Sequence, residues 1–268
     1  MTPTQVADQL RALGLPRGAT VVVHTAFSTV RPIEGGPLGL IHALQATIGP
    51  EGTLVMPTMS AGDTPFDPAT TPTLDMGIVA ETFRSLPGVV RSTHPAASFA
   101  ARGPQAQAIC APQPLVPLHG PDSPPGRVWS LDGFVLLLGV GHDANTTIHV
   151  AEVLENVPYW QAHPCVVRVN GQPATVRLPE TDHCCAGFER VRPECPGHTS
   201  RVGQAHATLM RSRTVVTAAR ALLTHDPLAF LCPATKRCPD CDAARANIGR
   251  PPPVPAPTHT SEGRPRWF

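Results

Sequence analysis

Apolar residues recur with two different periods along residues 1–150 of the chain. Spacings of three and four residues, typical of amphipathic helices, cover 3–13, 36–48 and 76–86. Short β-branched and aliphatic runs, typical of buried strands, cover 20–23, 53–57 and 135–138. Helices that alternate with strands in this way pack on the faces of a parallel sheet. The pattern therefore predicts an α/β fold around a largely parallel sheet.

The pattern changes after residue 158, where a β-hairpin is predicted. Two strand-like runs, 165–169 and 174–178, flank the dipeptide Asn170-Gly171. Asn-Gly favours the type I′ turn that joins two antiparallel strands, because both residues tolerate positive φ. A last amphipathic helix is predicted over 208–223.

Domain boundaries follow from the same change in composition. We expect one domain over 1–250, in which the portion from about 180 to 245 is rich in cysteine. From residue 251 the chain is rich in proline and poor in core-forming residues. The stretch 251–268 is therefore predicted to be a disordered tail.

The segment 136–152 carries the clearest candidate chemistry. It combines a buried strand, a turn with two glycines and the start of a helix, with residues suited to capping that helix at 145–147. His149 and Glu152 lie three positions apart and so share one face of the predicted helix. An imidazole beside a carboxylate suits a general base, which makes His149 and Glu152 the candidate catalytic pair. Such strand-to-helix turns are also where open α/β sheets bind ligands.

Composition narrows the class of protein. Positive and negative charges nearly balance, at a formal net charge of +1, which argues against partners such as nucleic acid or a membrane surface. No apolar run reaches the ~18 residues of a membrane span. The N-terminal segment lacks the basic start and apolar run of a secretory signal, so a cytoplasmic location is expected. The oligomeric state stays open, a homodimer included.

Six of the eight cysteines lie beyond residue 180. Without a secretory signal, metal ligands or free thiols are expected rather than disulfides. Cys238 and Cys241 form a CxxC pair, a spacing found in structural zinc sites. The predicted zinc ligands are Cys232, Cys238, Cys241 and Cys185. The fourth place is also open to His183, Cys184 and Cys195. The competing interpretation is a set of small buried residues and exposed thiols, and a redox CxxC lacks thioredoxin-like surroundings.

A series of motifs in collinear order carries a resemblance to a known family. The motifs include 21–25 (VVVHT), 49–58 (GPEGTLVMPT), 66–68 (FDP), 71–73 (TPT), 91–95 (RSTHP) and the segment 139–152. Together they extend over roughly residues 4–190. On these motifs the chain resembles the aminoglycoside 3-N-acetyltransferases.

The resemblance implies a fold and a reaction. The fold is a three-layer α/β/α sandwich around a largely parallel sheet, here with a small C-terminal portion that contains the predicted hairpin. The reaction moves an acetyl group from acetyl-CoA to an amine of an aminoglycoside, at the 3-N position of its 2-deoxystreptamine ring. The expected partner is therefore a small-molecule amine acceptor, and antibiotic resistance is the expected role.

This reaction needs a base, a cradle for the thioester and a surface that binds the amine. His149 is the expected base, with Glu152 as the group that orients it, and direct attack by the amine needs no covalent enzyme intermediate. The expected CoA contacts are Thr25, Ala26, Phe27, Ser28, Ser92, Ser98 and Phe99. The expected acceptor contacts are His24, Asp63, Asp67, His142 and Asn145. Each of these residues also fits a purely structural role in the core, in a turn or on the surface.

One departure from the family pattern concerns the acceptor. Family members carry a long loop with paired tryptophans after the strand that ends here at Pro57, whereas only residues 59–65 lead to Phe66 in this chain. Two alternative functions therefore stay open. One is acetyl transfer to an amine that is not an antibiotic, and the other is a catalytically degenerate module that binds zinc.

Overall fold

The computed structural model describes residues 1–256 of the chain. The helices are α1 (Pro3–Ala12), α2 (Phe27–Val30), α3 (Gly36–Ile48), α4 (Gly77–Arg84), α5 (Ala106–Ile109), α6 (Pro124–Ser130), α7 (Ile148–Leu154), α8 (Ser212–His225) and α9 (Pro239–Arg245). The 3-10 helices are η1 (His142–Ala144), η2 (Ala186–Val191) and η3 (Ala234–Lys236). The strands are β1 (Thr20–Thr25), β2 (Thr53–Pro57), β3 (Val90–Arg91), β4 (Phe99–Arg102), β5 (Phe134–Leu138), β6 (Gln161–Val169), β7 (Gln172–Glu180), β8 (His198–Val202) and β9 (Ala205–Arg211).

Seven strands form the main sheet, in the order β3-β4-β2-β1-β5-β9-β8. Its three central strands are parallel: β1 pairs with β2 on one side and with β5 on the other. The outer strands β4 and β9 run antiparallel to this centre. Because the central strands are parallel, β1, β2 and β5 all end at the same edge of the sheet, where ligands of open α/β folds bind.

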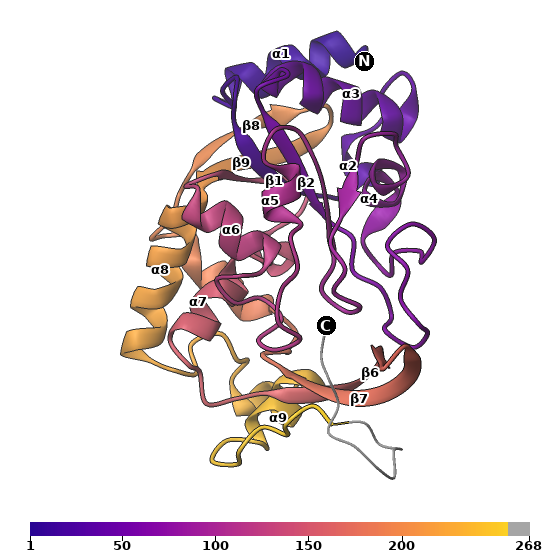
Figure 1. The fold of residues 1–268 in the computed structure, drawn as a ribbon. Helices are drawn as coiled ribbons and strands as arrows, with labels where there is room; N and C mark the ends of the chain where they lie inside the picture. Colours follow the sequence, from indigo (N-terminus) through magenta and orange to yellow (C-terminus); the bar gives the residue numbers. More distant parts are fainter. Residues whose placement is uncertain (257–268) are drawn as a thin grey trace.

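Helices cover both faces of the sheet, as the alternating burial of the central strands requires. In β1, Val21 and Val23 face the core that contains α1, α3 and α4, whereas Val22 faces the core that contains α7 and α8. In Figure 1, α3 and α4 gather on the right of the sheet and α6, α7 and α8 on the left. Strands buried on both faces read as near-continuous apolar runs, which explains why β5 is apolar throughout and why β1 has three consecutive valines at its centre.

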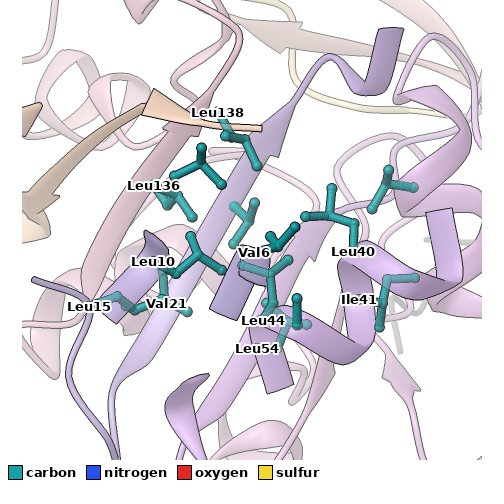
Figure 2. Packing of buried hydrophobic residues seen from close by; sticks show 14 of the residues in the cluster. Val6, Leu10, Leu15, Val21, Leu40, Ile41, Leu44, Leu54, Leu136 and Leu138 are labelled. Carbon is teal, nitrogen blue, oxygen red and sulfur yellow. The ribbon is translucent and has the colours of Figure 1, made fainter. Parts of the chain in front are cut away.

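The core on the first face is built from side chains at helical spacing (Figure 2). Val6 and Leu10 of α1 pack with Leu40 and Leu44 of α3 over Val21, and all five side chains are fully buried. Helix α1 begins with a capping box, in which the Thr2 hydroxyl accepts from the Gln5 N–H and the Gln5 side chain accepts from the Thr2 N–H. The predicted α/β fold, with helices on both faces of the sheet, is confirmed.

The prediction of a helix over 208–223 was wrong in its first part. Residues 208–211 belong to β9, which pairs with β5 through Leu136↔Leu209. Along β9, buried and more exposed residues alternate from Ala205 to Leu209, which is the pattern of a strand. Helix α8 begins only at Ser212. Residues 251–256 of the predicted tail have no regular structure, and its remainder lies outside the described residues.

The predicted hairpin forms a separate two-stranded sheet of β6 and β7. Asn170 and Gly171 both have positive φ, of 50° and 79°, as a type I′ turn requires. The hairpin strands are longer than predicted, and Cys165, Val167 and Val176 pack with Ala97 and Leu118 in a small separate core. Figure 1 shows the hairpin and α9 together beyond the lower end of the main sheet. The hairpin thus lies near the edge where the parallel strands end.

Candidate active site

Helix α7 is placed at the sheet edge by a tight turn after β5. Gly139 has φ 73°, and a Cβ there would lie 1.9 Å from the Thr29 hydroxyl oxygen, so only glycine fits. The chain then makes η1, and the side-chain oxygen of Asn145 accepts from the Thr147 N–H at 3.2 Å. Helix α7 begins at Ile148. This local sequence directs the first turn of α7 toward the ends of the parallel strands.

His149 and Glu152 form a hydrogen-bonded pair on this first turn. The distance between His149 Nδ1 and Glu152 Oε2 is 2.6 Å. The Glu152 side chain is fully buried, whereas the His149 side chain keeps 13% of its surface exposed. The second oxygen of Glu152 accepts hydrogen bonds from Tyr159 and, at 2.9 Å, from His183 Nε2. Glu152 is therefore a desolvated carboxylate surrounded by three hydrogen-bonding partners.

These contacts move the pKa values of both members of the pair. Burial by itself raises the pKa of Glu152, but the charge of His149 and the hydrogen bonds from His149 and His183 outweigh it and hold this pKa at about 2. Burial lowers the pKa of His149, yet the Glu152 charge outweighs burial and raises it well above 6.5. Glu152 is thus an anion at all ordinary pH values, and His149 is a stronger base than an isolated histidine.

Neighbouring rings fix the orientation of the His149 imidazole. His119 stacks on it with ring centroids 5.0 Å apart, and Phe188 meets it edge to face at the same distance. The thiol sulfur of Cys185 lies 3.9 Å from His149 Nε2. Because Nδ1 is held by Glu152, Nε2 is the nitrogen left to exchange a proton with a substrate.

A cavity of about 750 Å³ borders Glu152 and the His119 ring that stacks on His149, whereas His149 itself is not in its described lining. Tyr159, Glu180 at the end of β7 and residues 249–250 and 252–255 also line it. Burial, and then the neighbouring Asp182, raise the pKa of Glu180 to about 7, against the effect of His163. The cavity is large enough for a small molecule and carries carboxylates on its wall. Such a wall suits a ligand with several positive charges.

The predicted acceptor residues His24, His142 and Asn145 lie at the ends of β1 and β5. All three are buried. Burial lowers the pKa of His24 to about 4 and also lowers that of His142, so both imidazoles are neutral near pH 7. Among the described residues, their Nε2 atoms have no hydrogen-bond partner. Asn145 lies in the turn between η1 and α7, and its side-chain nitrogen lies 3.4 Å from His142 Nδ1.

The predicted acceptor residues Asp63 and Asp67 lie on the loop between β2 and α4. Both are solvent-accessible, and Asp67 accepts from the Ala69 N–H at 2.8 Å, which stabilises a local turn. The described lining of the cavity beside Glu152 includes neither aspartate. Their assignment to the acceptor stays a prediction.

The residues predicted to contact CoA divide into two groups. Thr25, Ala26, Phe27 and Ser28 end β1 and begin α2 at the edge of the sheet, and the buried Thr25 hydroxyl has no partner among the described residues. The second group is buried at the β2–β4 side, where side-chain atoms are used inside the protein. Ser98 donates to Thr58 O at 2.7 Å, and Ser92 accepts from the Phe99 N–H at 3.0 Å. Their assignment to CoA stays a prediction.

The cysteines of the C-terminal portion converge, with one correction to the predicted set. The sulfur atoms of Cys184, Cys232, Cys238 and Cys241 all lie within 4.8 Å of one another. Cys185 is not in this group. Its backbone is left-handed, with φ 55°, so adjacent residues point their side chains in different directions: Cys184 toward α9 and Cys185 toward His149. The fourth place in the cluster therefore belongs to Cys184, one of the alternatives.

Several residues around the pair were not singled out for this role from the sequence. They are His119, Tyr159, Glu180 and Thr181 in the cavity lining, Asp182, which shares the partner His163 with Glu180, and His183 and Cys185 beside the pair. One signal was present. The run Glu180-Thr181-Asp182-His183 places two acids and a histidine directly after a predicted hairpin, and such clusters at the end of a strand favour a binding site.

Comparisons with known proteins agree with this geometry. The family model described as aminoglycoside 3-N-acetyltransferase matches residues 22–224. Aminoglycoside N(3)-acetyltransferase IV of Salmonella sp is 50% identical over 236 residues, which are 85% of this chain and 90% of the relative.

Solved structures show the same similarity. Aminoglycoside acetyltransferase AAC(3)-IVa, as a histidine-to-alanine variant in complex with a gentamicin, superimposes with a TM-score of 0.89 at 48% identity, over 92% of this chain and 97% of that chain. The binary complex of AAC-IIIb with CoASH gives a TM-score of 0.76 at 27% identity, over 84% and 97% of the two chains. The chain belongs to the aminoglycoside 3-N-acetyltransferase family and is an acyltransferase.

Proposed function

We propose that this protein transfers the acetyl group of acetyl-CoA to the 3-amino group of the 2-deoxystreptamine ring of an aminoglycoside. The observation that carries the proposal is the buried His149–Glu152 pair beside a cavity with acidic walls. It is supported by the 50% identical relative, an aminoglycoside N(3)-acetyltransferase, and by similar proteins solved with gentamicin and with CoASH. A base beside a cation-binding wall suits acyl transfer to an amine.

The acceptor binds through charge in this proposal. An aminoglycoside carries several ammonium groups, and Glu180, with Asp182 beside it, offers carboxylates at the end of the hairpin. A bound polycation favours the anionic form of Glu180, so binding draws the proton off this residue. The apolar remainder of the cavity wall, such as Tyr159 and residues 252–255, covers the rings of the acceptor.

Acetyl-CoA fits the edge of the sheet where polar atoms lack partners. The buried Thr25 hydroxyl at the end of β1 and the Thr146 and Thr147 hydroxyls before α7 have no hydrogen-bond partner among the described residues. Buried polar groups are costly unless they are satisfied, so these atoms suit a polar ligand. The neutral His24 and His142 border the same edge. These residues would hold the acyl donor, which supplies the activated thioester.

The chemistry is a direct transfer. The acceptor ammonium first loses one proton to water. As the nitrogen lone pair forms a bond to the acetyl carbon and the bond to the thiol sulfur breaks, His149 Nε2 takes a second proton from the same nitrogen. Glu152 holds Nδ1–H of the resulting imidazolium and offsets its charge. His149 can return its proton to the departing thiolate, so that the products are the acetamide and the free thiol of CoA. No covalent enzyme intermediate is needed.

A second candidate acceptor is an amine that is not an antibiotic. Its motivation is the short segment 59–65 after β2, which lacks tryptophan. The degenerate zinc-binding module finds no support, because the chain belongs to a family of enzymes and its His149–Glu152 pair is complete.

The deciding experiment measures thiol release from acetyl-CoA with a panel of aminoglycosides and simpler amines. Release with an aminoglycoside, together with product NMR that places the new acetamide on N3, supports the proposal. Release only with other amines would select the second candidate. No release with any amine, from a folded protein that binds CoA, would contradict the proposed acceptor classes.

A further inference from the structure

Four thiols converge in the C-terminal portion, away from the reacting atoms. The sulfur of Cys184 lies 3.4 Å from that of Cys232 and 3.5 Å from that of Cys241. Cys238 completes a group whose sulfur atoms are all within 4.8 Å of one another. None of the four forms a disulfide. The thiols come from three separate segments: the start of η2, the segment before η3 and the start of α9.

This arrangement has the dimensions of a tetrahedral metal site. A Zn–S bond of about 2.3 Å in a tetrahedron places neighbouring sulfur atoms about 3.8 Å apart, close to the distances observed here. Cys238 and Cys241 have the CxxC spacing, with Cys238 capping α9. The Cys232 N–H donates to the sulfur of Cys241 at 3.3 Å, the kind of contact that stabilises a thiolate.

Packing alone does not account for the convergence. Cys232 and Cys241 are buried in a small core with Tyr159, Leu231 and Ala244. Apolar packing favours buried side chains, but it does not require four sulfur atoms from three segments to meet at one point. Arg245 donates to Cys232 O at 2.5 Å and pairs with Asp242 at 2.8 Å, so it ties α9 to the segment that carries Cys232.

We propose that Cys184, Cys232, Cys238 and Cys241 bind one structural Zn²⁺, and that this ion positions the segment 182–185 against the catalytic pair. Cys184 is flanked by the two residues that touch the pair. His183 Nε2 lies 2.9 Å from Glu152 Oε1, and the Cys185 sulfur lies 3.9 Å from His149 Nε2. The Cys185 N–H donates to His183 Nδ1 at 3.0 Å, which links these two residues directly.

The same segment is tied to α9 on its other side. Gln161 Nε2 donates to both Asp182 O, at 3.1 Å, and Asp240 O, at 3.2 Å. Metal ligation therefore joins three chain segments that otherwise meet through this small core and a few hydrogen bonds. The ion is a positioning group that acts through His183 and not a catalytic metal, because all four of its coordination places are taken by protein.

Metal content of the purified full-length protein tests the proposal without reference to acetyl transfer. After dialysis, mass spectrometry of the digested protein should find about one zinc per chain. Removal by a strong chelator should lower the midpoint of thermal unfolding by roughly 5 °C or more, and added Zn²⁺ should restore it. Replacement by Co²⁺ should give the visible absorption bands of tetrahedral thiolate coordination.

Variants separate ligation from folding. Cys238 lies at the partly exposed start of α9, and Cys238→Ser should reduce bound zinc from about one to near zero, with a several-fold fall in kcat and a smaller change in KM. Cys110→Ser is the matched control, because its thiol donates to Val90 O in another part of the protein and a hydroxyl can do the same. It should keep both zinc and activity.

Dialysed protein without metal, with four free thiols and an unfolding midpoint that neither chelator nor Zn²⁺ changes, would overturn the proposal. So would a pair of disulfides among these four cysteines. Zinc binding without any effect of its removal on kcat would overturn the positioning role alone.

Discussion

Replacement of Glu152 by glutamine perturbs the active site at its electrostatic centre. Glu152→Gln keeps the shape and one acceptor oxygen of the side chain but removes the charge that His149, His183 and Tyr159 surround. In the wild-type protein, this charge raises the pKa of His149 against the effect of burial. Without it, only the contact with Cys185 opposes the effect of burial, and the pKa of His149 is expected to fall.

The expected loss of kcat in Glu152→Gln follows from the pKa shift of the Glu152 carboxyl group. Burial raises the pKa of Glu152, but its contacts, His149 first, hold it at about 2 instead of 4.5. At ~1.4 kcal/mol per pKa unit, this difference is a net preference for the anion on the order of 3 kcal/mol, after the cost of burial has been offset. Because the same interaction stabilises the imidazolium that forms during transfer, we expect Glu152→Gln to lower kcat by roughly 10²-fold.

The assay is the pH dependence of kcat and kcat/KM, measured by thiol release. The wild-type acidic limb should report a pKa above 6.5, since His149 must lose its proton to act as a base. In the Glu152→Gln variant, the acidic limb of the pH profile should move to lower pH, and the maximal rate on its plateau should fall. Glu155→Gln is the control, since Glu155 ends the same helix and pairs with Arg220 at 2.6 Å in a partly exposed ion pair. A Glu152→Gln variant with unchanged kcat and an unmoved limb would refute this reasoning.

Four further predictions follow from the same structure. His149→Ala should lower kcat by ~10²–10⁴-fold with little change in CoA affinity by calorimetry, whereas unchanged turnover would remove it from the base role, with His142→Ala as comparison. Cys185→Ala should still transfer acetyl, and mass spectrometry should find no acetyl-Cys185 in the wild type; a trapped thioester would contradict direct transfer. Acceptor binding should tighten as pH rises through about 7, as Glu180 ionises, and Glu180→Gln should abolish this pH dependence. An unchanged pH dependence in the variant would exclude Glu180 as an acceptor-binding carboxylate. Phe83→Ala should cost ~3–5 kcal/mol in urea unfolding, and a cost under about 1 kcal/mol would contradict its place in the core.

Short-range sequence patterns predicted the helices, the central strands and the hairpin turn. The order of helices and central strands follows from apolar periodicity, and the hairpin turn follows from Asn170-Gly171. The relation of His149 to Glu152 follows from helical geometry alone. Apolar periodicity did not predict strand β9. Its seven residues lead directly into α8, and its pairing with β5 is a long-range contact. No local signal separates the end of that strand from the beginning of the helix.

The rest of the site depends on where distant segments meet. His183 reaches Glu152 across 31 positions because the hairpin carries the chain back to α7. Spacing could not decide between Cys184 and Cys185, since both closely follow His183 and only the left-handed backbone at Cys185 sends the two thiols to different places. Asp63 and Asp67 show the converse: an acidic loop is a plausible cation site by composition, but its path does not bring it to the described cavity lining.

The convergence on Glu152 explains why the hairpin and the C-terminal portion belong to the active site. A fully buried carboxylate is costly unless each oxygen has partners. Oε2 is satisfied within α7 by His149, but Oε1 depends on Tyr159 and His183, which flank the hairpin on either side. A change that displaces the hairpin therefore leaves an anion partly unsatisfied and shifts the pKa of His149 with it. In the proposed mechanism, the main sheet therefore places the base His149, whereas the hairpin and the cysteine-rich portion that follows it hold the contacts that raise its pKa.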